Sequence, residues 1–201
     1  MCIRDSLCWY AASESPLPPA GGVHEPAWVF GLFQTPAYAR AVRASAVKAS
    51  EELDRAVALR VARQARLHDE KSPTLRVVLD EAVLHRAIGG PVVMAEQLAH
   101  LVEVSRLPSV DLRVIPFALG AHPSLGAGFT VLRFESTPGM DVVYTETLRS
   151  ASYLEKPTDL DHYVEVFGQI SSAALSPDDS RELLDTLKRN LWERLGEGVE
   201  E

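Results

Sequence analysis

Cysteine is almost missing from this chain of 201 residues, which contains only two. Both of them, Cys2 and Cys8, lie near the beginning, so the remainder of the chain has no thiol group. This distribution excludes disulfides, thiolate zinc sites and a cysteine nucleophile from everything after Cys8. We expect a cytoplasmic protein that folds without a cofactor or metal, because a chain of this length can bury a sufficient apolar core.

Long apolar runs are missing as well, although 46% of the residues are hydrophobic. No stretch approaches the ~20 consecutive apolar residues that a bilayer-spanning helix needs, so we expect no membrane association. Catalytic signatures are missing too. The segment 120–128 lacks the first glycine of a serine nucleophile elbow and the third glycine of a dinucleotide-binding loop. These absences predict a domain that is not an enzyme.

Positive and negative charges are unevenly distributed along the chain, whose net charge is −8. Residues 35–67 contain seven Lys or Arg and three acids, whereas residues 135–201 contain fifteen acids and six bases. One interpretation is a set of solvated helix faces with local ion pairs. The other is that the basic helices lie beside a DNA-binding domain. An acidic chain is by itself a poor binder of nucleic acid.

Capping residues and apolar periodicity predict helices in the first half of the chain. Thr35-Pro36 supplies a capping hydroxyl and a proline at the first helical position, which predicts a helix over 37–46. Ser50 starts a second helix that ends near residue 67. The row of residues expected to be buried on this second helix is Leu53, Val57 and Val61.

A strand, a short helix and a longer helix are predicted next. The β-branched and apolar residues of 74–79 indicate a strand, Asp80 can cap the helix that follows, and Gly89 offers a left-handed stop. The apolar spacing over 92–106 predicts the longer helix.

The second half of the chain alternates with a period of two and then returns to helix. Short β-type runs separated by Gly, Pro and Ser indicate an antiparallel sheet. Two capping boxes, at 158–161 and 176–179, predict final helices over 159–174 and 177–195. The expected fold is α+β, with a small, largely antiparallel sheet of about four to five strands surrounded by helices. The β-type runs are 110–115, 128–134, 141–146 and 151–155.

Three regions are expected along the chain. Residues 1–24 contain a Pro-rich run and no periodicity, so we expect a disordered or non-native leader, either a frame-shifted start or a natural linker. Residues 25–196 are the expected regulatory domain, which binds a ligand or a partner. Residues 197–201 form an acidic tail that should fray.

Six short motifs occur in an order that resembles one protein family. The resemblance is to the C-terminal domain of unknown function in actinobacterial helix-turn-helix, antitoxin-like transcriptional regulators. In that family the domain follows a Cro/repressor-type DNA-binding domain. Val29-Phe30 departs from the family pattern, in which an apolar residue and a proline usually precede the first motif. The matching segments are 31–40 (GLFQTPAYAR), 63–67 (RQARL), 113–117, His122 with 128–129, 142–146 and 174–180, in addition to the run 79–101, which also resembles the family.

The resemblance implies a C-terminal regulatory module of a transcription factor. Genes of this family often neighbour genes for small acidic proteins, so a small acidic partner protein is expected ahead of a metabolite. DNA is expected to be contacted only through an N-terminal helix-turn-helix that should precede Gly31 and is not recognisable in this chain. A homodimer is compatible with these expectations.

Six residues are candidate ligand- or partner-binding residues. Glu81 and His85 are four residues apart on one predicted helix face, as an ion pair, a weak metal site or a base with its orienting carboxylate would require. His122 lies in a Gly-rich loop, which is either functional or a flexible hairpin connection. Tyr144 and Glu146 share one strand face, which is either an ordinary polar face or part of a polar floor with Glu81 and Arg113.

These candidates leave a second class of function open, a small-molecule sensor or relic enzyme with a polar cleft near 120–146. An apolar pocket with converging polar groups would favour the sensor, and an exposed apolar patch would favour a protein partner.

Overall fold

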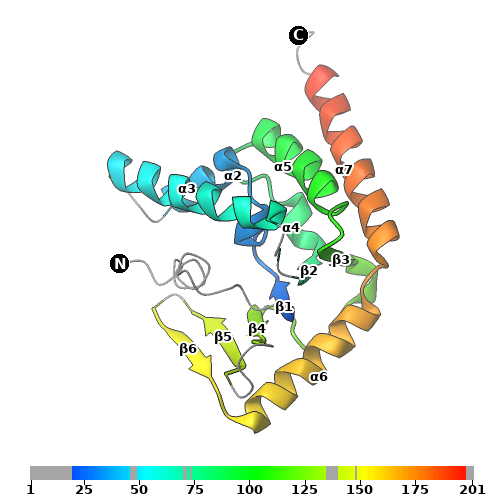
Figure 1. Cartoon of the computed structure of the whole chain (residues 1–201). Coiled ribbons are helices and arrows are strands. Elements are labelled where there is room, and N and C mark those ends of the chain that lie inside the picture. Colours follow the sequence, from blue (N-terminus) through cyan, green and yellow to red (C-terminus); the bar gives the residue numbers. More distant parts are fainter. Residues whose placement is uncertain are drawn as a thin grey trace.

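A six-stranded mixed sheet with helices on both faces forms the fold (Figure 1). The computed structural model describes residues 20–45, 49–69, 72, 74–134, 140–147 and 149–197. The strands lie in the order β3-β2-β1-β4-β5-β6. They are β1 (Ala20–Glu25), β2 (Thr74–Asp80), β3 (Val110–Ile115), β4 (Phe129–Leu132), β5 (Val142–Glu146) and β6 (Ala151–Leu154). The α-helices of the described chain are α2 (Pro36–Ala44), α3 (Ser50–Gln64), α4 (Glu81–His85), α5 (Pro91–Val104), α6 (Pro157–Ala173) and α7 (Pro177–Glu197).

The α+β class is confirmed, but the expected sheet was too small and too antiparallel. Strands β1, β2 and β3 pair in parallel, and β4, β5 and β6 continue the sheet antiparallel. Each parallel connection contains helices, as parallel pairing requires. The additional strand is β1, whose sequence AGGVHE carries two glycines and one β-branched residue and therefore has little strand character of its own.

Strand β1 also changes the interpretation of the beginning of the domain. It lies between β2 and β4, in the middle of the sheet. The boundary expected after residue 24 therefore falls inside a central strand, and residues 20–24 belong to the sheet. Residues 1–19 and 198–201 lie outside the described residues.

Alternating residues of each strand fill two cores on opposite faces of the sheet. On β2, Leu75, Val77 and Leu79 point to the larger core, which α5 and α7 complete. Val78 points to the opposite face and packs against α6. In Figure 1 α6 and α7 form a V, with α7 beside α5. Gly22 permits the close approach of α6, because a Cβ at this position would lie 2.9 Å from the Phe167 ring.

Several local signals are confirmed by the structure. The hydroxyl of Thr35 accepts a hydrogen bond from Tyr38 N at 3.2 Å. Asp80 Oδ1 accepts one from Ala82 N at 2.8 Å. Gly89 has the expected left-handed backbone, with φ of 79°.

Two local predictions were wrong. The box at 158–161 does not cap α6, which begins at Pro157 after Lys156, a residue that makes no side-chain capping bond. The buried row on α3 is confirmed only at Val57, which is buried, since Val61 is 38% exposed. The other buried residues of this helix are Arg60 and Arg63. Apolar spacing could not reveal this, because Arg60 is buried with its guanidinium group hydrogen-bonded to Gln34.

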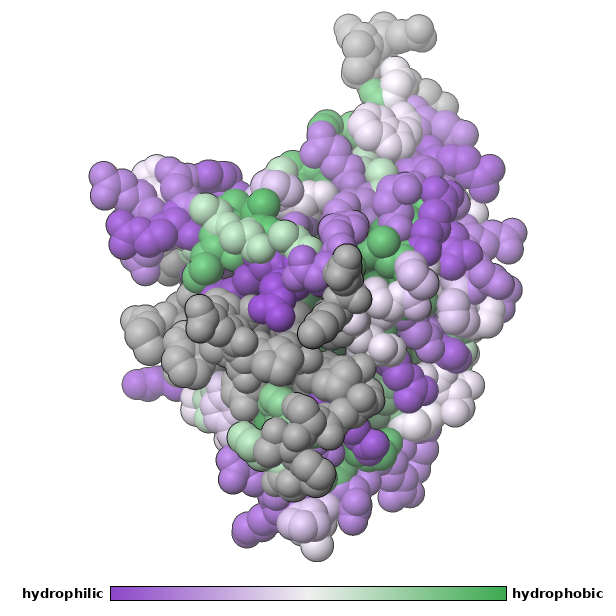
Figure 2. All heavy atoms as spheres, viewed as in Figure 1, coloured by the Kyte–Doolittle hydropathy of each residue, from purple (hydrophilic) through white to green (hydrophobic). Residues whose placement is uncertain are grey.

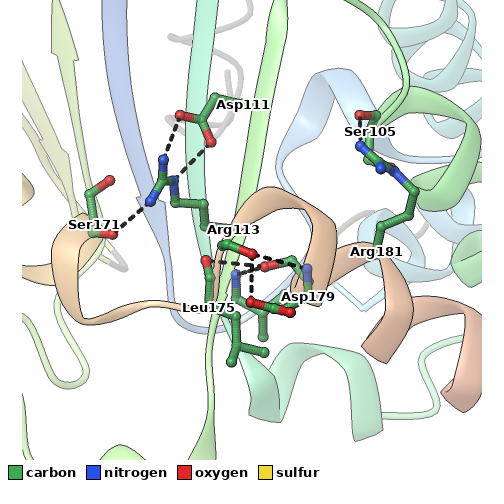
Figure 3. A network of polar contacts seen from close by, with 10 residues as sticks. Ser105, Asp111, Arg113, Ser171, Leu175, Asp179 and Arg181 are labelled. Atoms are coloured by element: carbon green, nitrogen blue, oxygen red, sulfur yellow. Dashed lines mark hydrogen bonds and ion pairs between the residues drawn. The ribbon is translucent and has the colours of Figure 1, made fainter.

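The connection between α6 and α7 covers the outer edge of β3 (Figure 3). Val114 N donates to Ser180 Oγ at 3.0 Å, and Val114 O accepts from Leu175 N at 2.9 Å. Arg181 adds hydrogen bonds to Ser105 at the end of α5. The outward backbone groups of Val114 are therefore bonded by the same segment that positions α7. None of the described helices is both long and apolar enough to cross a membrane.

Candidate functional site

The three parallel strands end on the same side of the sheet. Open α/β sheets bind ligands beside the carboxyl ends of their strands. Here β1 ends at Glu25, β2 at Asp80 and β3 at Ile115. Because side chains alternate along a strand, His24 and Glu25 point to opposite faces. Two polar clusters result, one on each face of the sheet.

The first cluster, called the histidine cluster, consists of His24, Asp80 and His122. His24 is fully buried, and its Nδ1 and Nε2 lie 3.3 Å from Val78 O and 3.2 Å from Ser124 O. The His122 ring stands edge-on to His24 with centroids 5.6 Å apart. His122 Nε2 lies 3.8 Å from Asp80 Oδ2, and the His122 side chain is only 2% exposed.

His24 faces two carbonyl acceptors, although a neutral imidazole has a single N–H. Burial lowers the pKa of His24, and the nearby His122 lowers it further, while the two carbonyls and Asp80 raise it. The net direction is downward, so the neutral ring predominates and donates to one of the two carbonyls at a time. The cluster fastens the segment around Ser124 to the centre of the sheet.

The second cluster, called the carboxylate cluster, consists of Glu25, Arg60, Tyr144 and Glu146. The Tyr144 hydroxyl donates to Glu146 Oε2 at 3.0 Å. Arg60 is buried on α3 and donates to Gln34 Oε1. Burial raises the pKa of Glu25 to about 8, the charge of Glu146 raises it further, and Arg60 opposes this shift. Glu25 is therefore largely protonated near neutral pH and can donate as well as accept a hydrogen bond.

The polar floor proposed from the sequence is not formed. Tyr144 and Glu146 do meet, but Arg113 lies on β3, four strand spacings or roughly 19 Å from β5. Arg113 bonds Asp111 at 2.9 Å and Ser171 O at 3.3 Å, which ties β3 to the end of α6 (Figure 3). Strand order separates these residues, and strand order is a non-local property of the sheet.

Glu81 and His85 form the pair that their spacing predicted, with Nε2 and Oε1 3.1 Å apart. Glu81 Oε2 also accepts a hydrogen bond from Phe117 N at 2.7 Å. The His85 ring stacks on the Phe117 ring with centroids 5.4 Å apart. The pair therefore holds the connection between β3 and β4, and it has no third ligating group beside it in the part of the chain that the structure describes.

This β3–β4 connection exposes three large apolar side chains, which we call the connection patch. Phe117 is 58% exposed, Leu119 37% and Leu125 64%. The backbone beneath them is ordered by short-range hydrogen bonds, including Gly120 N to Phe117 O and Leu125 N to His122 O, both 3.1 Å. Connections positioned by a rigid scaffold often carry binding residues, so these three exposed side chains are candidate contacts for a partner.

The basic helices offer less positive surface than the sequence suggested. Arg43, Arg60 and Arg63 are buried, and exposed Arg40 pairs with Asp54. Lys48 lies outside the described residues. Figure 2 shows that the visible face is largely polar and that apolar side chains gather over α3. Most of the excess positive charge of residues 35–67 therefore lies inside the protein or in ion pairs, and not on an open basic face.

Sequence reasoning missed His24, Glu25 and Arg60. The first two were overlooked because β1 was not recognised as a strand, so its end was not recognised as part of the carboxyl edge. Arg60 was counted only among the basic residues of 35–67, for which solvated helix faces and a position beside a DNA-binding domain were the two interpretations. Within the described residues no group of three or more His, Cys, Asp or Glu is arranged to hold a metal ion.

An open hollow on α7 is lined by Asp178, Arg181, Glu182, Asp185 and Arg189.

Comparison with known proteins gives a family and no activity. The model of the family described as "Domain of unknown function (DUF5753)" matches residues 22–186. No curated protein and no solved structure matches this chain.

Proposed function

We propose that this chain, which belongs to the DUF5753 family of domains of unknown function, is the regulatory module of a helix-turn-helix transcriptional regulator. In this proposal the domain binds a small acidic partner protein and carries out no reaction. DNA recognition belongs to a separate helix-turn-helix segment. The resemblance in the sequence motifs supplies the regulatory context, and the connection patch supplies the binding surface.

The observation that carries the proposal is the connection patch. Apolar side chains on a flexible loop can collapse onto the protein, but Phe117 is fixed by the Glu81 hydrogen bond and the His85 stack. Leu125 is fixed by its neighbours, because Ser124 O lies 3.2 Å from His24 Nε2 and Ser124 Oγ bonds Ala127 O at 2.5 Å. These side chains do not stabilise the folded chain while they are exposed to solvent. Burying them against a partner would stabilise the complex.

The test is binding of the full chain to the small acidic protein encoded beside its gene, measured by isothermal titration calorimetry. Replacing Phe117 and Leu125 by aspartate should weaken binding by at least about 30-fold, since burial of large apolar residues dominates interface energies. The matched control replaces Leu59 and Val61 of α3, which are 44% and 38% exposed, and should leave the affinity unchanged. Equal losses in both variants, or no binding by the wild type, would contradict the proposal.

A second candidate is a small-molecule sensor, which one observation favours. Both ring nitrogens of His122 are buried without a hydrogen-bond partner, at the sheet edge where ligands commonly bind. A polar ligand entering there would supply that partner. Thermal-shift screening with polar metabolites checks this candidate. A ligand whose stabilising effect disappears in His122→Ala, and persists in His85→Ala, would favour the sensor.

A further inference from the structure

Strand β6 forms an open edge of the sheet, whereas the opposite edge at β3 is covered. Its neighbour β5 pairs with it antiparallel, with Tyr144 opposite Tyr153 and Thr145 opposite Ser152. No strand pairs with its other side among the described residues. An exposed edge offers a row of backbone donors and acceptors to another strand.

The hydrogen-bond pattern of the β5–β6 hairpin shows which backbone groups point outward. Thr147 N donates to Ser150 O at 2.8 Å, so this is a hydrogen-bonded pair. Such pairs alternate along an antiparallel ladder, and the next is Thr145 with Ser152. Ser152 therefore directs its N–H and C=O toward β5. Ala151 and Tyr153 direct theirs away from it, where no described segment bonds to them.

Strand β6 is only four residues long, which limits its open edge, but it lacks other features that usually protect an edge. Besides being short, protected edges carry prolines, bulges, inward-pointing charges or covering segments. The residues Ala151–Leu154 include none of the first three, and Tyr153 is 47% exposed. The charged residues stand at the two ends instead, with Arg149 before the strand and Glu155 after it. Both are exposed, and neither has an ion pair within the described chain.

We infer that β6 is a self-association edge, at which two copies of this chain pair antiparallel about a two-fold axis at Ser152. Only backbone N–H and C=O groups that point away from β5 can bond to a second copy. In this register Ala151 of one copy therefore pairs with Tyr153 of the other. Ser152 of one copy then lies opposite Ser152 of the other, where two small hydroxyl side chains fit side by side. The register also brings Arg149 of each copy to Glu155 of the other, which gives two oppositely charged pairs.

Charge complementarity selects this register and this occupant. A two-fold axis at Tyr153 would place Arg149 opposite Pro157, and an axis at Ala151 would place Glu155 opposite Thr147. Only the axis at Ser152 pairs the two charges. Two six-stranded sheets would then form one continuous sheet. The edge lies at the opposite end of the sheet from β3, so self-association leaves the connection patch between β3 and β4 open to a partner.

The experiment measures the mass of the full chain by sedimentation equilibrium from about 1 μM to about 1 mM, the range that detects weak dimers. The wild type should dimerise. Arg149→Glu and Glu155→Arg should each weaken the dimer at least about tenfold, because each change creates two like-charged pairs per dimer. The double variant Arg149→Glu/Glu155→Arg should restore the wild-type affinity, which only a partner with the same sequence can explain.

A proline variant tests the backbone pairing separately. Ala151→Pro removes an outward N–H and should abolish the dimer, while the β5–β6 hairpin stays intact because proline is tolerated on edge strands at such positions. Ala151→Val keeps the N–H and should dimerise. A wild type that is monomeric throughout the range would overturn the inference, as would a dimer that the charge reversals leave unchanged.

Discussion

At the β3 edge of the sheet the outward N–H and C=O of Val114 bond Ser180 and Leu175. At the β6 edge the outward backbone groups of Ala151 and Tyr153 have no partner within the described part of the chain. The first edge follows a βα crossover and is closed by the last two helices. The second belongs to a hairpin that no described segment covers. Both edges have the same backbone chemistry, so the difference lies in what the rest of the chain places beside them.

The two ends of the sheet also differ in the side chains that pack against them. Near β3 the larger core is completed by α5 and α7 and is almost entirely aliphatic, with Leu98, Leu112 and Leu184 essentially buried. On the same face, beside β4 and β5, lies the carboxylate cluster, in which Arg60 and Tyr144 are buried and Glu25 and Glu146 are half-buried. The β3 end is therefore expected to be insensitive to pH and the β4–β6 end sensitive to it.

The largest expected effect is the pH dependence that Glu25 causes. Its pKa is about 8 in the folded chain and 4.5 as the ordinary value, so the folded chain binds more protons between these two pH values. Stability should therefore fall as the pH rises from about 4.5 to about 8, by on the order of a few kcal/mol. Urea unfolding at about pH 5 and about pH 8 measures this change.

Glu25→Gln should remove most of that fall, because glutamine stays neutral throughout the range. The matched control is Glu96→Gln on α5, which changes an exposed carboxylate away from both the carboxylate cluster and β6 and should keep the wild-type slope. Hydrogen exchange should show the loss of protection in β5 and not in α7. An unchanged slope in Glu25→Gln would mean that other groups govern the pH response.

An intermediate effect is expected when the covered edge is opened. Ser180→Ala deletes the hydroxyl that accepts from Val114 N, in a residue that is fully buried. The unpaired N–H should cost about 1–3 kcal/mol in the free energy of unfolding. Ser172→Ala on α6 is the control, since the Ser172 hydroxyl is exposed and bonds only Gly168 O of its own helix. If both variants lost the same stability, covering the β3 edge would contribute nothing specific.

The smallest effect is expected at the open edge. Tyr153→Ala removes a cross-strand ring contact with Tyr144, whose centroid lies 5.1 Å away. Such pairs contribute under about 1 kcal/mol, and thermal unfolding at a concentration where the chain is monomeric should show a correspondingly small shift. Tyr153→Phe keeps the ring and should match the wild type. A loss as large as that of Ser180→Ala would show that β6 stabilises the monomer as strongly as the covered edge does.

Local signals in the sequence predicted the helix boundaries well. Thr35 and Asp80 cap their helices as expected, and the box at 176–179 caps α7, where Asp179 N donates to Ser176 Oγ at 3.1 Å. These features depend on residues within a few positions of one another. The pairing of Glu81 with His85 was predictable for the same reason, since four residues make one helical turn.

The features that sequence reasoning missed depend on residues far apart in the chain. His24 and Ser124 are separated by 100 positions, and Gln34 and Arg60 by 26. Predicting the contact of His24 with Ser124 requires the strand pairing, and the sheet was predicted without β1 because β1 has weak strand propensity. A strand of this kind is stabilised by its two neighbours, β2 and β4, more than by its own residues.

By itself, the sequence determined the capped helices, the short strands of the second half and the left-handed turn at Gly89, because these follow from backbone preferences of neighbouring residues. Only the tertiary structure decided that Ala20–Glu25 is a central strand, that Arg113 and Glu146 lie apart, and that β3 is covered while β6 is open. Sheet pairing joins segments through backbone groups that every residue carries, so the side-chain sequence specifies it only through the packing of the whole domain.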